Sequence, residues 1–590
     1  MTKNMPKHIT QEFLDMVKLP EKDGKRLNYL IVMPRMVERD DTSYQFPYGL
    51  CIVSSALKAT GRNVFTLNLN YKHNHLEYLR NFIIDDSIDV VLSGGLSGQY
   101  AILKEIFDTA KSVDTNIITI CGGGIITADP LVAMQALETA DYGVIGEGEI
   151  TVNELAHAIE TNADSARIRG VVIKSDVLLP SLPLPRGEIT NLDCLPFPDY
   201  DGFEFEFLMR DGLYDTDGLA TLTTNVAISR SCPYNCTFCF HSSGKKYRRR
   251  SLDNVFEELD WLIAKYKLTR FTFADELFIS NAKLITEFCE RIKPYNLTWW
   301  AQTRVDTVSF EILSKLKDAG CYTISYGVES ADNSILKSMC KNITVEQIDA
   351  AFEAAKQAGL EAYGNLIFGD LEETAETIKN SLDWRVSHPE YNIRLGWIIT
   401  FPGSHLYKTA IERGIISDPV QYLKGGCPQI NVSKLSDENY WQTVHQLELF
   451  RIMYGERYGG LANKFGEFDT HRFKANLENL LTDCQKIAVW PATKRSLELL
   501  NSISEDFIKS EKVYLINIAP NGLPTRGLEQ KIQTPDVIAE QNIDTVFCPS
   551  LSHVSDIFEQ IRDMIDKSYP SVQKIIYIKD LIRATAFTFE

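Results

Sequence analysis

The strongest limit on the fold of this 590-residue chain comes from short apolar runs that each stop at a loop of small residues. Between residues 28 and 160, Val90–Leu92 ends in Ser93-Gly94-Gly95, and Ile117–Ile120 is soon followed by Gly122-Gly123-Gly124. Helix-like stretches lie between the runs, and this alternation predicts an open parallel sheet. Ligands of such sheets bind beyond the carboxyl ends of the strands, where glycine lets a backbone approach closely. The alternative is that these loops are only tight turns.

A second alternation runs from residue 223 to 403. One of its helices can be explained residue by residue, because Ser251 can cap it, Asp253 favours its first turn, and apolar residues recur on one face as far as Tyr266. Six strand–helix units of this length predict a partial α/β barrel. The candidate strands are Asn225–Ser229, Phe271–Phe273, Leu297–Gln302, Tyr322–Tyr326, Tyr363–Ile367 and Trp397–Phe401.

The predicted fold class is therefore α/β: an N-terminal Rossmann-like parallel sheet, a central partial (β/α)6 barrel, a helical segment and a small C-terminal α/β domain. The first turn of the C-terminal domain, Trp490–Thr493, lacks the glycines that a nucleotide phosphate would need, so we expect a docking or scaffolding role there. The predicted boundaries are 1–27 for an N-terminal extension, 28–160 for the first sheet, 161–222 for a proline-rich linker, 223–403 for the barrel, 404–484 for helices that cover the barrel mouth, and 485–590 for the C-terminal domain.

The charge balance excludes several classes of partner. Lys plus Arg number 61 against 79 Asp plus Glu, a net charge of −18, which argues against general binding to nucleic acid or to an anionic membrane. The apolar runs are far shorter than the roughly 20 residues that span a bilayer, and the N-terminal residues contain no apolar stretch of signal-peptide length. We expect a cytoplasmic protein with no nucleic-acid and no membrane partner.

Three of the twelve cysteines lie together, directly after the first predicted barrel strand. Cys232, Cys236 and Cys239 can ligate three irons of a [4Fe–4S] cluster and leave the fourth iron open. A zinc site is the alternative, but zinc favours paired ligands from two segments, and His241 is not spaced as such a pair. The other nine cysteines are scattered, and we expect them to be packing residues without disulfides.

The CxxxCxxC loop, with Phe238 before its last cysteine, resembles the mark of the radical S-adenosylmethionine (SAM) enzymes. The similarity covers roughly residues 223 to 410. It implies a [4Fe–4S] cluster held by Cys232, Cys236 and Cys239, with SAM on the open iron, and strand-end carboxylates that accept hydrogen bonds from the SAM ammonium and ribose. The residues expected on the SAM side are Phe238, Asp275, Glu276, Gln302, Arg304, Glu329 and Gly364.

Residues 28–160 resemble the N-terminal cobalamin-binding domain that many of these enzymes carry. No histidine occurs between Pro34 and Leu50, so the lower axial ligand of methionine-synthase-type cobalamin domains is missing, as it commonly is in the related radical enzymes. A degenerate domain that no longer binds cobalamin is the alternative. The residues expected on the cobalamin side are Tyr48, Gly49, Ser93, Gly94, Gly95, Gly122, Gly123, Gly124 and Glu147.

A basic run follows the cysteine loop, from Lys245 to Arg250. Such runs are usually solvated, and we expect that here. The alternative is that one arginine of the run meets a carboxylate or a phosphate of a bound cofactor.

The resemblance implies a cobalamin-dependent radical SAM enzyme, in the branch that holds the anaerobic magnesium-protoporphyrin ester cyclase and the B12-dependent radical SAM methyltransferases. The preferred function is C-methylation of an unactivated carbon in a small metabolite or peptide. The cluster would cleave SAM to a 5′-deoxyadenosyl radical, methylcobalamin would donate the methyl group, and a flavodoxin- or ferredoxin-type protein would supply single electrons. No catalytic side chain is assigned.

Two other functions stay open. The same cofactors could drive a radical cyclisation, oxidation or rearrangement without methyl transfer. The chain could also be a cobalamin-binding regulator whose barrel has become a scaffold, although the intact cysteine loop argues against that reading.

Overall fold

The computed structural model describes residues 6–21, 24–35, 46–70, 72, 74–174, 184–205, 224–278, 281–441, 443–444, 470–490, 492, 500, 504–516, 533–548, 565 and 568–577. The chain divides into two compact units, Met1–Leu382 with Gly396–Lys434, and Asp383–Leu395 with Leu435–Glu590. Among the described residues, no helix combines the length and the apolar character that a membrane crossing requires.

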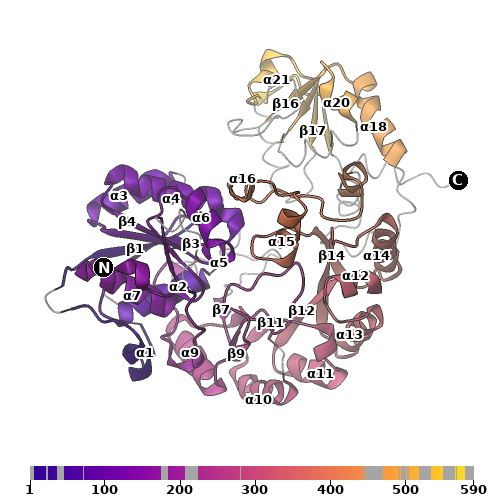
Figure 1. Ribbon diagram of the computed structural model, residues 1–590. Coiled ribbons are helices and arrows are strands. Elements are labelled where there is room, and N and C mark those ends of the chain that lie inside the picture. Colours follow the sequence, from indigo (N-terminus) through magenta and orange to yellow (C-terminus); the bar gives the residue numbers. More distant parts are fainter. Residues whose placement is uncertain are drawn as a thin grey trace. The chain divides into compact units, whose positions relative to one another are not determined.

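The first unit opens with a six-stranded sheet of order β2-β1-β3-β4-β5-β6, parallel except where β6 pairs with β5. Helices α2 and α7 lie on one face, and α3, α4 and α6 on the other (Figure 1). This confirms the predicted parallel α/β sheet. Its elements are α1 (Gln11–Met16), β1 (Asn28–Met33), α2 (Tyr48–Ala59), β2 (Asn63–Asn68), α3 (His75–Asp85), β3 (Val90–Gly94), α4 (Tyr100–Val113), β4 (Ile118–Gly122), α5 (Gly124–Ala128), α6 (Pro130–Ala136), β5 (Tyr142–Val144), α7 (Gly148–Thr161) and β6 (Val171–Ile173).

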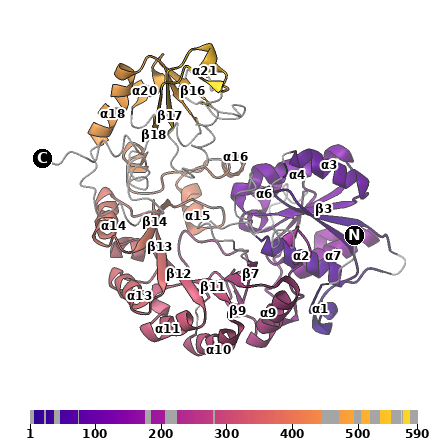
Figure 2. The ribbon, with the colours of Figure 1, turned by 180° about the vertical axis from the view of Figure 1, so that it is seen from behind.

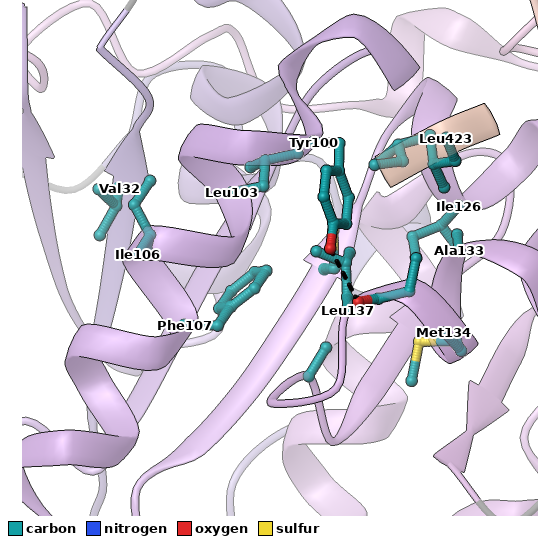
Figure 3. Close-up of a cluster of buried hydrophobic side chains, with 14 of the residues drawn as sticks. Val32, Tyr100, Leu103, Ile106, Phe107, Ile126, Ala133, Met134, Leu137 and Leu423 are labelled. Carbon is teal, nitrogen blue, oxygen red and sulfur yellow. Dashed lines mark hydrogen bonds between the residues drawn. The ribbon is translucent and has the colours of Figure 1, made fainter. Parts of the chain in front are cut away.

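The core of this sheet forms because α4 presents one apolar face. Leu103, Ile106 and Phe107 recur at helical spacing and are fully buried, and each such side chain contributes roughly 1.5–3 kcal/mol of burial free energy. Figure 3 shows them with the buried side chains of α5 and α6. The hydroxyl of Tyr100, a polar group within this cluster, donates a hydrogen bond to the Ala136 carbonyl at 3.1 Å.

A second sheet has the order β14-β13-β12-β11-β10-β7, and its strands β7 to β13 belong to the first unit. The pairs from β7 to β13 are parallel, and helices α10, α11 and α13 lie on the outer side of strands β11 and β12 in both views (Figures 1 and 2). Six strands were predicted, and the sheet contains six, but its last strand, β14, precedes the predicted Trp397–Phe401. The elements are β7 (Thr224–Val226), α9 (Leu252–Tyr266), β10 (Arg270–Phe273), α10 (Ala282–Ile292), β11 (Thr298–Thr303), α11 (Phe310–Asp318), β12 (Cys321–Glu329), α12 (Asn333–Ser338), α13 (Val345–Gln357), β13 (Glu361–Phe368), α14 (Ala375–Ser387) and β14 (Asn392–Trp397).

Two predicted strands differ from the structure. Asn225–Ser229 is divided, because after β7 the chain leaves the sheet and forms β8 (Ser229–Arg230), which pairs antiparallel with β9 (Arg248–Arg249). Trp397–Phe401 is not a strand, since β14 ends at Trp397 and the following residues turn, with the Phe401 amide donating to the Ile399 carbonyl. The predicted helix cap is confirmed, as Ser251 accepts a hydrogen bond from the Asn254 amide.

The segments around the two sheets are packed more closely than the sequence indicated. Helices α15 (His405–Glu412) and α16 (Pro419–Lys424), predicted to cover the barrel mouth, add Tyr407 and Leu423 to the core of the first sheet. In the segment predicted as a linker, Val171–Ile173 forms β6, and Leu192 and Leu195 are buried beside α1. This packing is explained by the apolar residues that lie between the prolines of this segment.

The second unit contains a parallel sheet of order β16-β15-β17-β18. The four strands agree with the predicted C-terminal α/β domain. Residues 445–469, within the predicted helical segment, and Pro491 and Thr493 of the turn Trp490–Thr493 lie outside the described residues. The elements are α18 (Thr470–Asp483), β15 (Ile487–Val489), α20 (Glu505–Lys509), β16 (Val513–Leu515), α21 (Val537–Glu540), β17 (Thr545–Cys548) and β18 (Lys574–Tyr577).

Candidate cofactor site

The three clustered cysteines lie in the loop between β8 and β9. The loop backbone is held from two sides, because the Thr237 amide donates to the Met339 carbonyl at 3.0 Å, and the Leu406 amide donates to the Thr237 carbonyl at 3.1 Å. Phe238 packs on the apolar cluster that contains Ile335 and Met339. The loop is therefore fixed by α12 and the start of α15 without help from the thiols.

The thiols differ in how readily they ionise. A hydrogen bond from Cys239 lowers the pKa of Cys236 to about 6, which favours the thiolate, while burial raises the pKa of Cys232. A [4Fe–4S] cluster needs thiolates on separate irons, and three thiols on one loop fit that requirement.

Two buried cations lie near these thiols. The positive charge of Lys341 lowers the pKa of Cys236, and Lys341 is ion-paired with Glu329 at 2.7 Å. Arg304 stacks on the Tyr234 ring, 3.7 Å from its centroid, and donates to the Lys341 carbonyl at 2.6 Å. Positive charge at this place stabilises the net negative charge of a thiolate-bound cluster.

Glu329 has an unusual backbone. Its φ is +66°, a region that non-glycine residues seldom occupy, and the pairing of β12 with β13 is irregular between Tyr326 and Glu329. A Cβ at Gly327 would meet the Lys341 Nζ at 2.5 Å and the Glu329 Oε1 at 2.7 Å, so a larger residue there would displace this ion pair. Such strain is found mostly at functional sites.

The adjacent acids Asp275 and Glu276 have different surroundings. Asp275 is buried, and its carboxylate accepts from the Ile228 amide at 3.1 Å and from the Ser229 amide and hydroxyl. Burial raises the pKa of Asp275 to about 6. Glu276 is exposed and contacts His241 at 2.9 Å, a hydrogen bond that raises the pKa of His241. Asp275 therefore positions the chain before the cysteine loop, and Glu276 is the acid available to a ligand.

Gln302 and Gly364 face opposite sides of the second sheet. Gln302 is exposed and is paired with Ser325 on the neighbouring strand, and Ser325 is paired in turn with Tyr363. Gly364 registers with Tyr326, whose ring lies 5.3 Å from Phe352 of α13. Because paired residues of parallel strands point to the same face, Gly364 belongs to the helix-covered side, and the structure does not bring it to the other SAM-side residues.

The glycine loops of the first sheet press against each other. A Cβ at Gly94 would lie 2.8 Å from the Gly122 carbonyl oxygen, and one at Gly123, where φ is +80°, would lie 3.0 Å from the Gly95 backbone. Gly124 is confined by the Leu96 side chain. The Ser93 hydroxyl donates to the Val32 carbonyl. These loops present an uncharged, backbone-rich edge, which suits a large cofactor recognised by shape.

The remaining cobalamin-side residues divide into two groups. Tyr48 and Gly49 begin α2, and Gly49 faces open space, since an added Cβ would have no neighbour within 4 Å. Glu147 is different, because it is buried in ion pairs with Arg230 and Arg248 at 2.7 and 2.8 Å. The structure thus gives Glu147 protein partners in place of the cofactor contact expected from the sequence.

Sequence reasoning overlooked several residues around the site. Arg248 and Arg250, expected to be solvated, are buried, whereas Lys245, Lys246 and Arg249 of the same run are exposed. Arg250 pairs with Glu258 at 2.5 Å. Lys341 also carried no motif that marked it. Of the nine scattered cysteines, eight are buried as expected, but Cys340 is exposed.

Comparison with known proteins matches each of the first two sheets to a family model. A model described as the radical SAM superfamily matches residues 226–385, and one described as the B12 binding domain matches residues 41–156. An uncharacterized methyltransferase of Pyrococcus horikoshii is 32% identical over 349 residues, which cover 56% of this chain and 73% of the relative.

Two further matches bear on the fold and the function. The anaerobic magnesium-protoporphyrin IX monomethyl ester cyclase of Cereibacter sphaeroides is 27% identical, over 53% of this chain and 52% of the cyclase. Among solved structures, the radical SAM methyltransferase TsrM from Kitasatospora setae, with cobalamin and a [4Fe–4S] cluster bound, matches with a TM-score of 0.55 at 18% identity. That match covers 66% of this chain and 78% of TsrM, and it shows similarity of fold.

Proposed function

The chain belongs to the radical SAM superfamily, as an enzyme with a B12-binding domain, and from that premise we propose that it methylates an unactivated carbon of a small metabolite or peptide. Its cofactors are a [4Fe–4S] cluster, SAM and cobalamin. The relative from Pyrococcus horikoshii, named a methyltransferase, supports the reaction class. The finer statement, the unactivated carbon, is the part that needs an experiment.

One contact carries the proposal: the cysteine loop touches the glycine loop of the first sheet. Phe240 follows Cys239, and its ring lies 3.7 Å from the position that a Cβ on Gly124 would occupy. The same ring packs tightly against Gly403. A Cβ on Gly403 would also meet Ala128 of α5 at 3.1 Å. The two cofactor regions therefore adjoin, as an enzyme that uses both on one substrate requires.

The chain's own residues would share the work as follows. Cys232, Cys236 and Cys239 would hold the cluster, Lys341 and Arg304 would balance its negative charge, and Glu329 would receive the SAM ammonium or ribose. When bound, the cluster supplies the electron for SAM cleavage, and cobalamin carries the methyl group. An external one-electron reductant, of the flavodoxin or ferredoxin type, is part of the proposal.

The face of the second sheet opposite its helices is the candidate seat for the substrate. The helix-covered face carries Trp299, which packs on Phe288 of α10, so the neighbouring Trp300 and Gln302 point to the other face. The ring centroids of Trp300 and Tyr363 are 6.4 Å apart, and Gln302 is exposed. Aromatic faces with a neutral amide suit an apolar or planar group better than a charged one.

Product analysis tests the methyltransferase proposal. The anaerobically reconstituted enzyme is incubated with SAM, cobalamin, a one-electron reductant and candidate substrates, and the products are quantified. Equal amounts of S-adenosylhomocysteine and 5′-deoxyadenosine, with a substrate that gains one CH2, are expected. Formation of 5′-deoxyadenosine with substrate conversion but without S-adenosylhomocysteine would exclude methyl transfer.

That second outcome would support the other candidate, a radical cyclisation, oxidation or rearrangement with the same cofactors. The observation in its favour is the similarity to the Cereibacter sphaeroides cyclase, which extends over 330 residues. The cyclase also makes clear that this kind of chain is not restricted to methyl transfer. The ratio of the two SAM products separates the candidates in a single experiment.

A further inference from the structure

Glu147 lies where the first sheet meets the cysteine loop. It is the residue before α7, three residues after the end of β5, and only 7% of its side chain is exposed. At this carboxyl edge of the sheet a carboxylate could face a cofactor. Its hydrogen bonds show instead that it faces the strands at the root of the cysteine loop.

One carboxylate binds both of those strands. Arg230 of β8, two residues before Cys232, donates to Glu147 Oε1 at 2.7 Å, and Arg248 of β9 donates to its two oxygens at 2.8 and 2.9 Å. Arg230 and Arg248 register with each other across the β8–β9 pair. The Ile189 amide donates to Glu147 Oε2 at 2.7 Å. Glu147 thus ties the two ends of the cysteine loop to the start of α7.

The two arginines have further partners in the network. Arg230 also pairs with Glu149 at 2.6 Å, and Arg248 donates to the Ser243 carbonyl at 2.6 Å and to the Ile189 carbonyl at 2.8 Å. A third acid, Glu188, lies 3.9 Å from Arg248, so each arginine faces two carboxylates. Arg248, at 3% side-chain exposure, is shielded from water, where charge-assisted hydrogen bonds hold geometry strongly.

We infer that Glu147 is a positioning residue that sets the placement of the cobalamin-binding sheet against the cysteine loop through Arg230 and Arg248. The inference rests on the proposed joint use of both cofactors. It assigns Glu147 no contact with either cofactor. Its effect is to hold the cobalt and the cluster at one separation, while Phe240 fills the space between the loops.

The test replaces Glu147 by glutamine in the full chain, loaded with cluster and cobalamin. Glu147→Gln keeps the shape but removes the charge that both arginines share. We expect the cobalamin dissociation constant and the iron content to stay within about twofold of wild type. The spin–spin coupling between the reduced cluster and cob(II)alamin, seen by electron paramagnetic resonance, should broaden or weaken, because the separation is no longer held at one value.

The matched control is Glu154→Gln, on the same helix, because Glu154 pairs with Arg186 and with no residue near the cysteine loop. This variant should retain the wild-type coupling. If Glu147→Gln fails to load, Glu147→Asp keeps the charge but shortens the side chain, and a changed coupling with normal cobalamin affinity supports the inference equally.

Two results would overturn the inference. A tenfold or greater loss of cobalamin affinity with unchanged coupling would make Glu147 a cofactor ligand. Wild-type coupling in both Glu147 variants would make the network dispensable for placement. Affinity and coupling are measured without substrate, so failure of the proposed methyl transfer would leave both readouts intact and is distinguishable from failure of this inference.

Discussion

The two sides of the cofactor site differ in residue composition and in charge. The loops after β3 and β4, Ser93–Gly98 and Gly122–Ile126, contain no charged residue, and their glycines bring backbone against backbone. The cysteine loop between β8 and β9 carries the three thiols, and the cations Lys341 and Arg304 and the anion Glu329 lie near them. We therefore propose that one side recognises a cofactor by shape and the other by charge and ligation, in which case substitutions should affect the two cofactors separately.

The largest separation should come from removing the thiols. The triple substitution Cys232→Ala, Cys236→Ala and Cys239→Ala should abolish cluster assembly and lower 5′-deoxyadenosine formation at least about 1,000-fold, since each thiolate holds an iron. Cobalamin affinity should stay within about twofold, because the glycine loops are untouched. Iron content and absorption spectra measure both effects. Cys340→Ala, at an exposed cysteine, is the control that should retain the cluster. A four-iron cluster in the triple variant would contradict the assignment.

The reverse separation should come from the glycine loops. Gly123→Ala places a Cβ on a residue with φ of +80° and 3.0 Å from the Gly95 backbone, a strain of about 1–2 kcal/mol before the clash is counted. We expect cobalamin affinity to fall roughly tenfold or more and cluster content to remain normal. Gly187→Ala, outside both loops and with no neighbour within 4 Å of an added Cβ, should bind cobalamin like wild type. Normal affinity in Gly123→Ala would show that this loop does not shape the cobalamin site.

A smaller effect should reveal the charge on the cluster side. Lys341→Met removes a buried cation near Cys236 and leaves Glu329 without its partner, so the reduced cluster loses stabilisation. The midpoint potential of the cluster should fall by on the order of 50 mV, while the cobalt potential changes little. Lys337→Met, at an exposed lysine of α12, should leave both potentials unchanged. An unchanged cluster potential in Lys341→Met would remove Lys341 from the electrostatics of the site.

The smallest effect concerns stability and pH. Burial raises the pKa of Glu373 to about 7, so the folded protein holds this proton where the unfolded chain has lost it. The free energy of unfolding should therefore decrease as pH rises from about 4.5 to about 7, and Asp275, with its pKa of about 6, acts in the same direction.

Glu373→Gln mimics the protonated acid and should remove its part of that decrease, about 2 kcal/mol between pH 5 and pH 8. Denaturant titrations of both proteins at the two pH values measure it, with exposed Glu376→Gln as the control. An equal stability difference at both pH values would mean that the carboxyl of Glu373 is ionised throughout.

Much of this arrangement could be predicted from the sequence because it is local. The strands β3, β4 and β10 to β13 are recognisable as apolar runs ahead of small or polar residues, and Ser251 caps α9 as expected. The CxxxCxxC spacing places three thiols on one loop whatever surrounds it. Burial of Arg248 could not be predicted, because its neighbours Lys246 and Arg249 are exposed. In the sequence alone, the run is indistinguishable from a basic segment exposed to solvent.

The sequence by itself determined the kind of chemistry, through the cysteine spacing, and the kind of sheet, through the alternation of strands and helices. Only the tertiary structure decided which way the acids point. Asp275 turns back to the Ser229 amide, and Glu147 crosses to Arg248, 101 residues away. The reason is physical: a motif sets which group stands at a strand end, but the direction of its side chain follows from strand register and from partners that distant segments supply.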